Sequence, residues 1–150
     1  MKLESFDRDG IRVWLEDGIL LREIPLGDGT CRHYHKNGAL ECEYEKVGGK
    51  THGLVRAWHD NGELAKELTR VDGQVVGTVR IWNREGILER ELEYVTPAAI
   101  YGTTYHRGKK MPDVFLWNGK PISKSRWLKK VEAAGIPRSE LERRFLTRKP

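Results

Sequence analysis

The chain has 150 residues, of which 27 are Lys or Arg and 22 are Asp or Glu, and its formal net charge is +5. A hydrophobic share of 38% in a chain of this length supports one folded domain with a small appendage and argues against disorder. No apolar run approaches the ~20 residues of a membrane helix, Met1–Glu4 does not resemble a signal peptide, and two Cys cannot supply a disulfide framework. We therefore expect a cytoplasmic globular protein with free thiols.

An aromatic residue and a turn glycine recur along the first two thirds of the chain. The aromatic positions Trp14, Tyr34, Trp58 and Trp82 are 20, 24 and 24 residues apart. Each is followed four residues later by a glycine and six residues later by a leucine, the glycines being Gly18, Gly38, Gly62 and Gly86 and the leucines Leu20, Leu40, Leu64 and Leu88. A weaker fifth unit contains Tyr105, Gly108 and Gly119. This periodicity predicts a repeated structural unit.

The turn chemistry indicates what each unit is. Asp17-Gly18, Asn37-Gly38 and Asn61-Gly62 are dipeptides typical of type I′ hairpin turns, and the flanking residues alternate in polarity with the period of a strand. We expect a mainly β protein, an open curved antiparallel meander of about five hairpins followed by a short pair of α-helices. The units are predicted near residues 9–28, 29–52, 53–76, 77–97 and 102–120, and a basic helical cap or tail over 121–150.

Two-residue turns at these glycines would also set the register. They place an Arg opposite a Glu in each of four units, the pairs being Arg12 and Glu23, Arg32 and Glu43, Arg56 and Glu67, and Arg80 and Glu91. Each pair is worth only a few tenths of a kcal/mol to about 1 kcal/mol, but a slip of one residue would bring unlike faces together. We therefore expect the pairs to specify the register.

Strand alternation then assigns two faces to the sheet. The face expected to be packed carries Val55, Ala57, Leu64 and Leu68, and in the next unit Val79, Ile81, Leu88 and Leu92. The other face carries the aromatic residues beside the Arg–Glu pairs. A single sheet has little to pack against, so we expect another part of the chain to cover one side.

The segments Gly53–Leu64 and Gly77–Trp82 resemble MORN-variant repeats, as does the join Gly49-Lys50-Thr51-His52-Gly53. The resemblance covers roughly residues 9–97 and extends more loosely to Gly119. Proteins built from such repeats include antitoxin components of the YwqK type. The resemblance therefore implies a scaffold that binds a protein partner, with a toxin as one candidate, and an antitoxin- or immunity-like role.

The C-terminal third differs from the repeats in charge and pattern. Residues 1–98 carry a net charge of −4, and residues 99–150 carry +9. Ser123 is a predicted N-cap for a helix with Trp127, Leu128 and Val131 on one side and Gly135 as its stop. A second helix is predicted from a capping box at Ser139–Glu142, with Leu141 and Phe145 four residues apart.

Three roles are open for these helices. They can cap the sheet, with Trp127, Leu128 and Phe145 as the buried residues. They can bind nucleic acid through a basic surface of Lys129, Lys130, Arg143 and Arg144, or meet an acidic protein partner. Attachment to a membrane surface is disfavoured because the helices are short and only modestly apolar.

The candidate partner-binding residues are Trp14, Tyr34, Trp58 and Trp82 together with Arg56 and Arg80, because interface hot spots favour aromatic and Arg side chains. The competing interpretation is that periodic aromatic residues only pack the repeat. Cys31, His33, His35 and Cys42 lie near one another in the predicted sheet, but alternate strand positions do not make a tetrahedral site, so we expect no metal.

The chain contains no recognisable catalytic or cofactor-binding motif. We therefore expect a protein that is not an enzyme, holds no cofactor and binds a protein partner. The alternative is nucleic-acid binding by the tail, with the repeats serving dimerisation or regulation. Open sheet edges at both ends also make a homodimer a candidate assembly.

Overall fold

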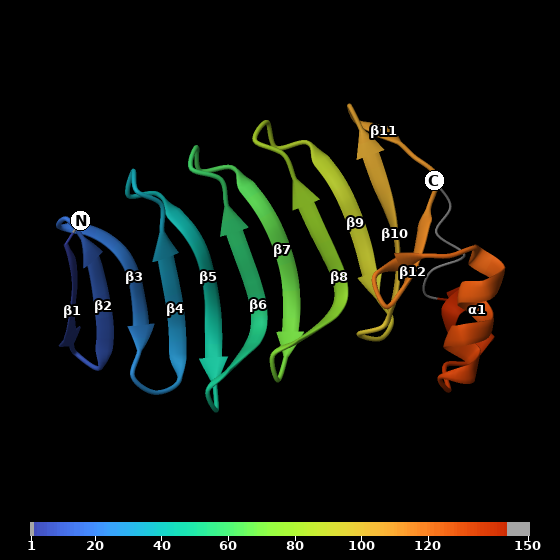
Figure 1. Cartoon of the computed structure of the whole chain (residues 1–150), viewed down its shortest axis with the longest axis horizontal. Coiled ribbons are helices and arrows are strands. Elements are labelled where there is room, and N and C mark those ends of the chain that lie inside the picture. Colours follow the sequence, from blue (N-terminus) through green and yellow to red (C-terminus); the bar gives the residue numbers. More distant parts are fainter. Residues whose placement is uncertain (1, 144–150) are drawn as a thin grey trace.

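The computed structural model describes residues 2–143, which form one antiparallel sheet followed by two short helices (Figure 1). The repeats contain β1 (Leu3–Arg8), β2 (Ile11–Glu16), β3 (Ile19–Pro25), β4 (Gly29–Tyr34), β5 (Leu40–Val47), β6 (Lys50–Trp58), β7 (Leu64–Val71), β8 (Gln74–Trp82) and β9 (Leu88–Tyr94). The C-terminal end contains β10 (Ala99–His106), β11 (Lys109–Lys110), β12 (Val114–Trp117), β13 (Lys120–Pro121), α1 (Lys124–Ala133) and α2 (Arg138–Leu141).

The strands follow one another across the sheet in chain order, so the topology is an uninterrupted meander. The order is β1 to β10, then β12 and β13, with β11 paired to the far end of β10. The predicted fold class, a mainly β meander of hairpins with C-terminal helices, is confirmed. The first strand, β1, was not predicted, although Asp9-Gly10 carries the positive φ values of a two-residue turn (50° and 76°) that joins it to β2.

The strands of the meander are joined by two main kinds of connection, two-residue turns and longer loops. Asp17-Gly18 and Asp72-Gly73 have positive φ at both residues, as type I′ turns require. Asn37-Gly38 and Asn61-Gly62 do not form such turns, because in each pair only the glycine has a positive φ. They lie in five-residue loops; in the second of these, residues 59–63, His59 N donates to Glu63 O at 2.8 Å. The prediction of two-residue turns at these Asn-Gly pairs is therefore wrong.

The predicted register is correct in three units and wrong in the first. Arg32, Arg56 and Arg80 lie opposite Glu43, Glu67 and Glu91. Arg12 instead lies opposite Ile24, and Glu23 lies opposite Val13. Each of these hairpins has a bulge near its loop, between Trp14 and Leu15 in the first unit and between Ala57 and Trp58 in the third. In the later units the longer loop and the bulge change the pairing in opposite directions, so the register beyond the bulge is the predicted one. The first unit has a true two-residue turn, so its bulge alone shifts the register by one residue.

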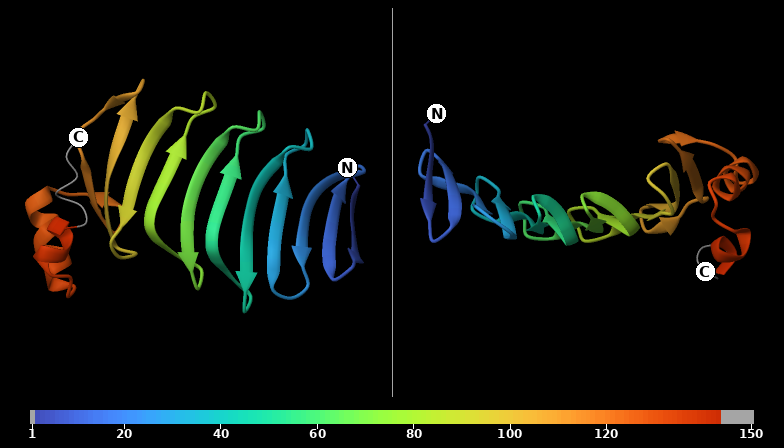
Figure 2. Two further views of the ribbon diagram at one scale, coloured as in Figure 1. Left: turned by 180° about the vertical axis from the view of Figure 1, so that it is seen from behind. Right: turned by 90° about the horizontal axis from the view of Figure 1, so that it is seen from below.

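The same bulges correct the assignment of the faces. Leu64 lies opposite Trp58 and Leu88 opposite Trp82, so both leucines belong to the aromatic face and not to the aliphatic one. Leu68 and Val79, which are 5% and 3% exposed, remain on the aliphatic face. Figure 2 shows the repeats as a single curved layer, so neighbouring side chains within the sheet supply this burial.

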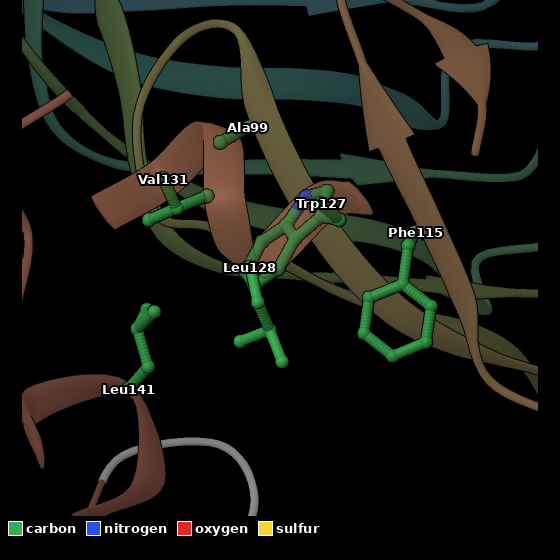
Figure 3. Close-up of a cluster of buried hydrophobic side chains, with 6 residues drawn as sticks. All are labelled: Ala99, Phe115, Trp127, Leu128, Val131 and Leu141. Atoms are coloured by element: carbon green, nitrogen blue, oxygen red, sulfur yellow. The ribbon is translucent and has the colours of Figure 1, made fainter. Parts of the chain in front are cut away.

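A second layer exists only at the C-terminal end of residues 2–143, where α1 and α2 pack beside the last strands (Figures 1 and 2). The buried cluster there contains Ala99, Phe115, Trp127, Leu128, Val131 and Leu141 (Figure 3). Trp127 Nε1 donates a hydrogen bond to Leu116 O at 3.0 Å, which satisfies the one polar atom of a buried ring. The predicted apolar side of the first helix is thus its packed side.

The helix ends agree only partly with the sequence pattern. Ser123 caps α1 as predicted, its Oγ accepting from Arg126 N at 3.4 Å, and Gly135 follows the helix with φ 88°. The capping box at Ser139 is wrong, because α2 begins at Arg138 directly after the extended Pro137. Phe145, the third predicted plug, lies outside the described residues. Within the described part of the chain, neither helix has the length and apolar character needed to cross a membrane.

Candidate functional site

Charged side chains of alternating sign form a continuous line across the middle of the sheet. We call the seven residues of this line the ionic row, and they are Glu23, Arg32, Glu43, Arg56, Glu67, Arg80 and Glu91, one from each strand from β3 to β9. Each Arg therefore lies between two carboxylates on neighbouring strands. The sequence predicted pairs within hairpins, and the structure joins these pairs across the hairpins as well.

The ion pairs of the row have hydrogen-bonding geometry. Arg32 Nε lies 2.7 Å from Glu43 Oε2, and the same contact measures 3.0 Å from Arg56 to Glu67 and 2.9 Å from Arg80 to Glu91. The Arg side chains keep 40–49% of their surface exposed. The row is therefore an accessible surface with a fixed charge pattern.

Arg12 does not join this row. Its Nε and Nη2 bind the Asp7 carboxylate at 2.7 and 3.0 Å, and this hydrogen bonding lowers the pKa of Asp7. Because the first hairpin is shifted by one residue, Arg12 pairs toward β1 and not toward β3. The ionic row therefore begins at Glu23.

The aromatic column, Tyr34, Trp58, Trp82 and Tyr105, flanks the ionic row. Trp14 was predicted on this face but lies on the aliphatic one, because the shifted first hairpin places it opposite Arg22, which lies opposite His33. The four side chains of the column are half-buried, as is Trp14. Tyr34 donates its hydroxyl to Glu23 Oε2 at 2.7 Å, and burial together with this bond raises the pKa of Tyr34 to about 12. The guanidinium of Arg22 lies 5.5 Å from the ring centre of Trp14. No helix of residues 2–143 covers Tyr34, Trp58 or Trp82, because the helices pack beside β10 and β12.

A shallow cavity of about 370 Å³ lies at the C-terminal end of the aromatic column. It is lined by Ile87 of the β8–β9 loop, by Glu89 near the start of β9, and by Tyr105 and His106. Ile87 is 44% exposed beside it. This cavity gives the aromatic column a concave end.

The long loops of successive hairpins are linked side by side. His35 Nε2 donates to Trp58 O at 2.8 Å, and His59 Nε2 donates to Trp82 O at 3.0 Å. Asn37 Nδ2 donates to Asp60 O at 2.7 Å, and the equivalent Asn61 donates to Arg84 O at 2.8 Å. We call these four bonds the loop ladder. They hold each loop and the aromatic residue before it against the next unit.

Sequence reasoning missed this loop ladder. Its signal was the recurrence of a His two residues before Asn-Gly, in His35–Gly38 and His59–Gly62. A histidine whose Nε2 faces a carbonyl oxygen must carry a proton on that nitrogen, so both rings have a defined tautomer.

Cys31, His33, His35 and Cys42 do not converge on one point. His33 lies opposite Cys42, Cys31 is fully buried opposite Tyr44, and His35 is engaged with the loop ladder. Within residues 2–143 no three His, Cys, Asp or Glu side chains are grouped closely enough to hold a metal ion. Burial, with the nearby Arg22, lowers the pKa of His33 and so favours its neutral form.

The basic residues of the tail surround the cap. Lys129 is exposed, and Lys130 Nζ lies 4.9 Å from the ring centre of Trp117. An open groove of about 440 Å³ lies beside them and is lined in part by Lys120 and Arg126. Arg143 is the last described residue, and Arg144 lies outside the described residues.

Comparison with known proteins identifies the repeat. Residues 51–72, which cover nearly all of β6, the long loop and the whole of β7, match the MORN repeat variant family. No curated protein sequence matches the chain significantly. Among solved structures, the crystal structure of accessory secretory protein 1, 2 and 3 in Streptococcus pneumoniae is similar at 12% identity and a TM-score of 0.37. The match covers 69% of this chain and 19% of that one. The molecule is a β-hairpin repeat protein in which one hairpin matches the MORN repeat variant family.

Proposed function

We propose that this protein is a non-catalytic scaffold that binds a protein partner through the ionic row and the aromatic column. The observation that carries the proposal is that both features run together over the same uncovered face of the sheet. Half-buried aromatic rings and Arg side chains are the groups that interface hot spots favour. The loop ladder and the ion pairs hold these groups in place before binding, which lowers the entropic cost of association.

The charge pattern of the row favours a folded protein as the partner. Alternating Arg and Glu side chains present both signs at regular spacing, so matching charges would set the register of a partner and contact with the aromatic side chains would add affinity. The MORN-variant resemblance suggests a toxin as the candidate partner and an antitoxin- or immunity-like role. That last step depends on the resemblance alone.

The test is affinity capture of a stoichiometric partner, followed by calorimetry with the purified pair. The double variant Trp58→Ala/Trp82→Ala should weaken binding by more than about tenfold, as expected when hot-spot residues are truncated. Val47→Ala/Val71→Ala is the matched control. These exposed residues end β5 and β7, at the edge of the sheet away from the long loops that follow Tyr34 and Trp58. Equal affinity of the double tryptophan variant and the wild type would remove the aromatic face from the binding site. Turnover of a substrate by the purified protein would contradict the non-catalytic role.

Nucleic-acid binding by the tail is the second candidate, favoured by the +9 net charge of residues 99–150 and the groove beside Trp117. It predicts an affinity that falls steeply with salt, by about one log unit per log salt for each phosphate contact. A variant in which Lys129, Lys130, Arg143 and Arg144 are all changed to Glu would lose such binding. Unchanged mobility of DNA and RNA at low salt would exclude this candidate.

A further inference from the structure

The two ends of the sheet differ in how their edges are protected. At the C-terminal end, β13 contains two residues, one of them Pro121, and α1 follows it directly. At the N-terminal end, β1 is six residues long and presents one backbone edge with no strand beside it among residues 2–143. Leu3 and Phe6 on this strand are 66% and 47% exposed. An open edge of this kind is a template for another strand.

The backbone of β1 defines which residues can pair outward. Lys2 O accepts from Asp17 N at 2.9 Å, and this bond fixes the alternation along the strand. The even-numbered residues direct their N–H and C=O groups to β2. Leu3, Ser5 and Asp7 therefore direct theirs away from the sheet.

We propose that two copies of this chain associate through antiparallel pairing of their β1 strands, with Phe6 opposite Phe6 and Glu4 opposite Arg8 of the second copy. A two-fold pairing that respects the hydrogen-bonding alternation must be centred on one residue. A register centred on Ser5 sets Glu4 against Phe6, and one centred on Asp7 sets two carboxylates against each other. The register centred on Phe6 places opposite charges together twice, once on each side of the symmetry axis.

The side chains of this register suit the face on which they lie. Phe6 lies opposite Val13, which is 3% exposed, and Val13 lies opposite Glu23, so the two Phe6 rings would lie on the same face as the ionic row and extend it across the interface. They would form a non-hydrogen-bonded pair, the type in which cross-strand side chains approach most closely. Glu4 now contacts Lys2, and Arg8 Nη2 lies 3.7 Å from Glu23 Oε1. Their side chains are 42% and 65% exposed, so both can turn toward a second copy.

The test is a charge exchange followed by sedimentation or light scattering of the full chain. Wild-type protein should dimerise, whereas Glu4→Arg and Arg8→Glu alone should each raise the dimer Kd by more than about tenfold, because two like-charged pairs replace two attractive ones. An equimolar mixture of these two variants should dimerise again, since every pair across the mixed interface is then of opposite sign. The double variant Glu4→Arg/Arg8→Glu should also dimerise.

Two controls separate this interface from general effects of charge and folding. Glu89→Arg reverses an exposed charge on β9 and should leave the dimer intact. Ser5→Pro removes an outward N–H that β2 does not use, so it should disrupt the dimer without unfolding the chain. A monomeric wild type, or single charge variants that dimerise like the wild type, would overturn the proposal. It is independent of the proposed partner-binding face, and failure of one leaves the other standing.

Discussion

The middle of the sheet and its C-terminal end stabilise the same kind of strand in different ways. In the repeats each strand is held by its two neighbours, and a single layer gives buried positions such as Leu68 and Val79. At the C-terminal end the helices add a second layer, and Trp127, Val131 and Leu141 reach 1%, 0% and 0% exposure. Only the second arrangement resembles the core of an ordinary globular domain. The repeats therefore extend the molecule, and the C-terminal helices supply its one two-layered core among the described residues.

The largest expected effect is in this two-layered core. Trp127→Ala removes a buried ring and the donor to Leu116 O, and should lower the free energy of unfolding by about 3–5 kcal/mol. Urea denaturation measures this loss. Trp82→Ala, at a half-buried position in the repeats, is the matched variant and should cost clearly less. Equal losses would show that the cap is no more important to stability than a single repeat.

A steric test probes the junction between the two regions. A Cβ at Gly102 in β10 would lie 2.5 Å from Glu91 O and 2.8 Å from Leu92 Cα, so Gly102→Ala should destabilise the protein by about 1–3 kcal/mol. Gly27→Ala is the control, because a Cβ there meets nothing within 4 Å and the backbone has no positive φ. It should change stability by no more than about 0.5 kcal/mol. Thermal unfolding of both variants compares them, and a neutral Gly102→Ala would mean that β9 and β10 are less closely packed than described.

A smaller effect distinguishes the ion pairs of the two regions. A double-mutant cycle on Arg56 and Glu67 should give a coupling of about 0.2–1 kcal/mol that decreases with added salt. The cycle on Arg138 and Glu142, an i,i+4 pair on the helical side with a 3.0 Å contact, should give about 0.3–0.5 kcal/mol. Because Arg56 also lies opposite Glu43, removing Arg56 should disturb two pairs. Zero coupling at low salt would mean that the row does not help to set the register.

The smallest expected effect is a pH dependence that acts on the repeats alone. The five histidines all precede residue 107, and burial lowers the pKa of His33 in the folded protein. The unfolded chain then binds the proton more strongly, so stability is full above pH ~6.5 and decreases as the pH falls below that value. His33→Phe should reduce this loss of stability at low pH, because phenylalanine binds no proton. The substitution breaks no hydrogen bond of the imidazole Nε2, which has no partner. His106→Gln, an exposed position, should not. Urea midpoints at pH 7 and pH 5 measure the difference.

Much of the fold was predictable because the residues that end strands and helices recur at recognisable positions in the sequence. Glycine turns and period-2 alternation predicted the hairpins, and Ser123 and Gly135 marked the ends of the first helix. The errors arose where one extra residue decides the geometry. A bulge cannot be counted from a dipeptide, so Arg12 was paired with Glu23 and Leu64 was placed on the wrong face.

The candidate surface was predictable in composition but not in continuity. Alternation placed Trp58 beside Arg56 and Glu67, and the structure agrees with that placement. Whether Glu67 would also lie opposite Arg80 depends on the bulge between β7 and β8, which no local pattern reveals. The hydrogen bond from His59 to the next loop is likewise a contact between repeats, and it requires knowing how they stack.

The uninterrupted order of the strands has a consequence for how the molecule loses structure. From β1 to β9 every strand pairs only with its neighbours in the chain, so opening one end leaves the other end's contacts intact. Amide hydrogen exchange should therefore form a gradient, fastest at the N-terminal hairpin of the isolated chain and slowest near the helices. Such a molecule would lose its strands one after another from the N-terminal end and would not unfold in a single cooperative step.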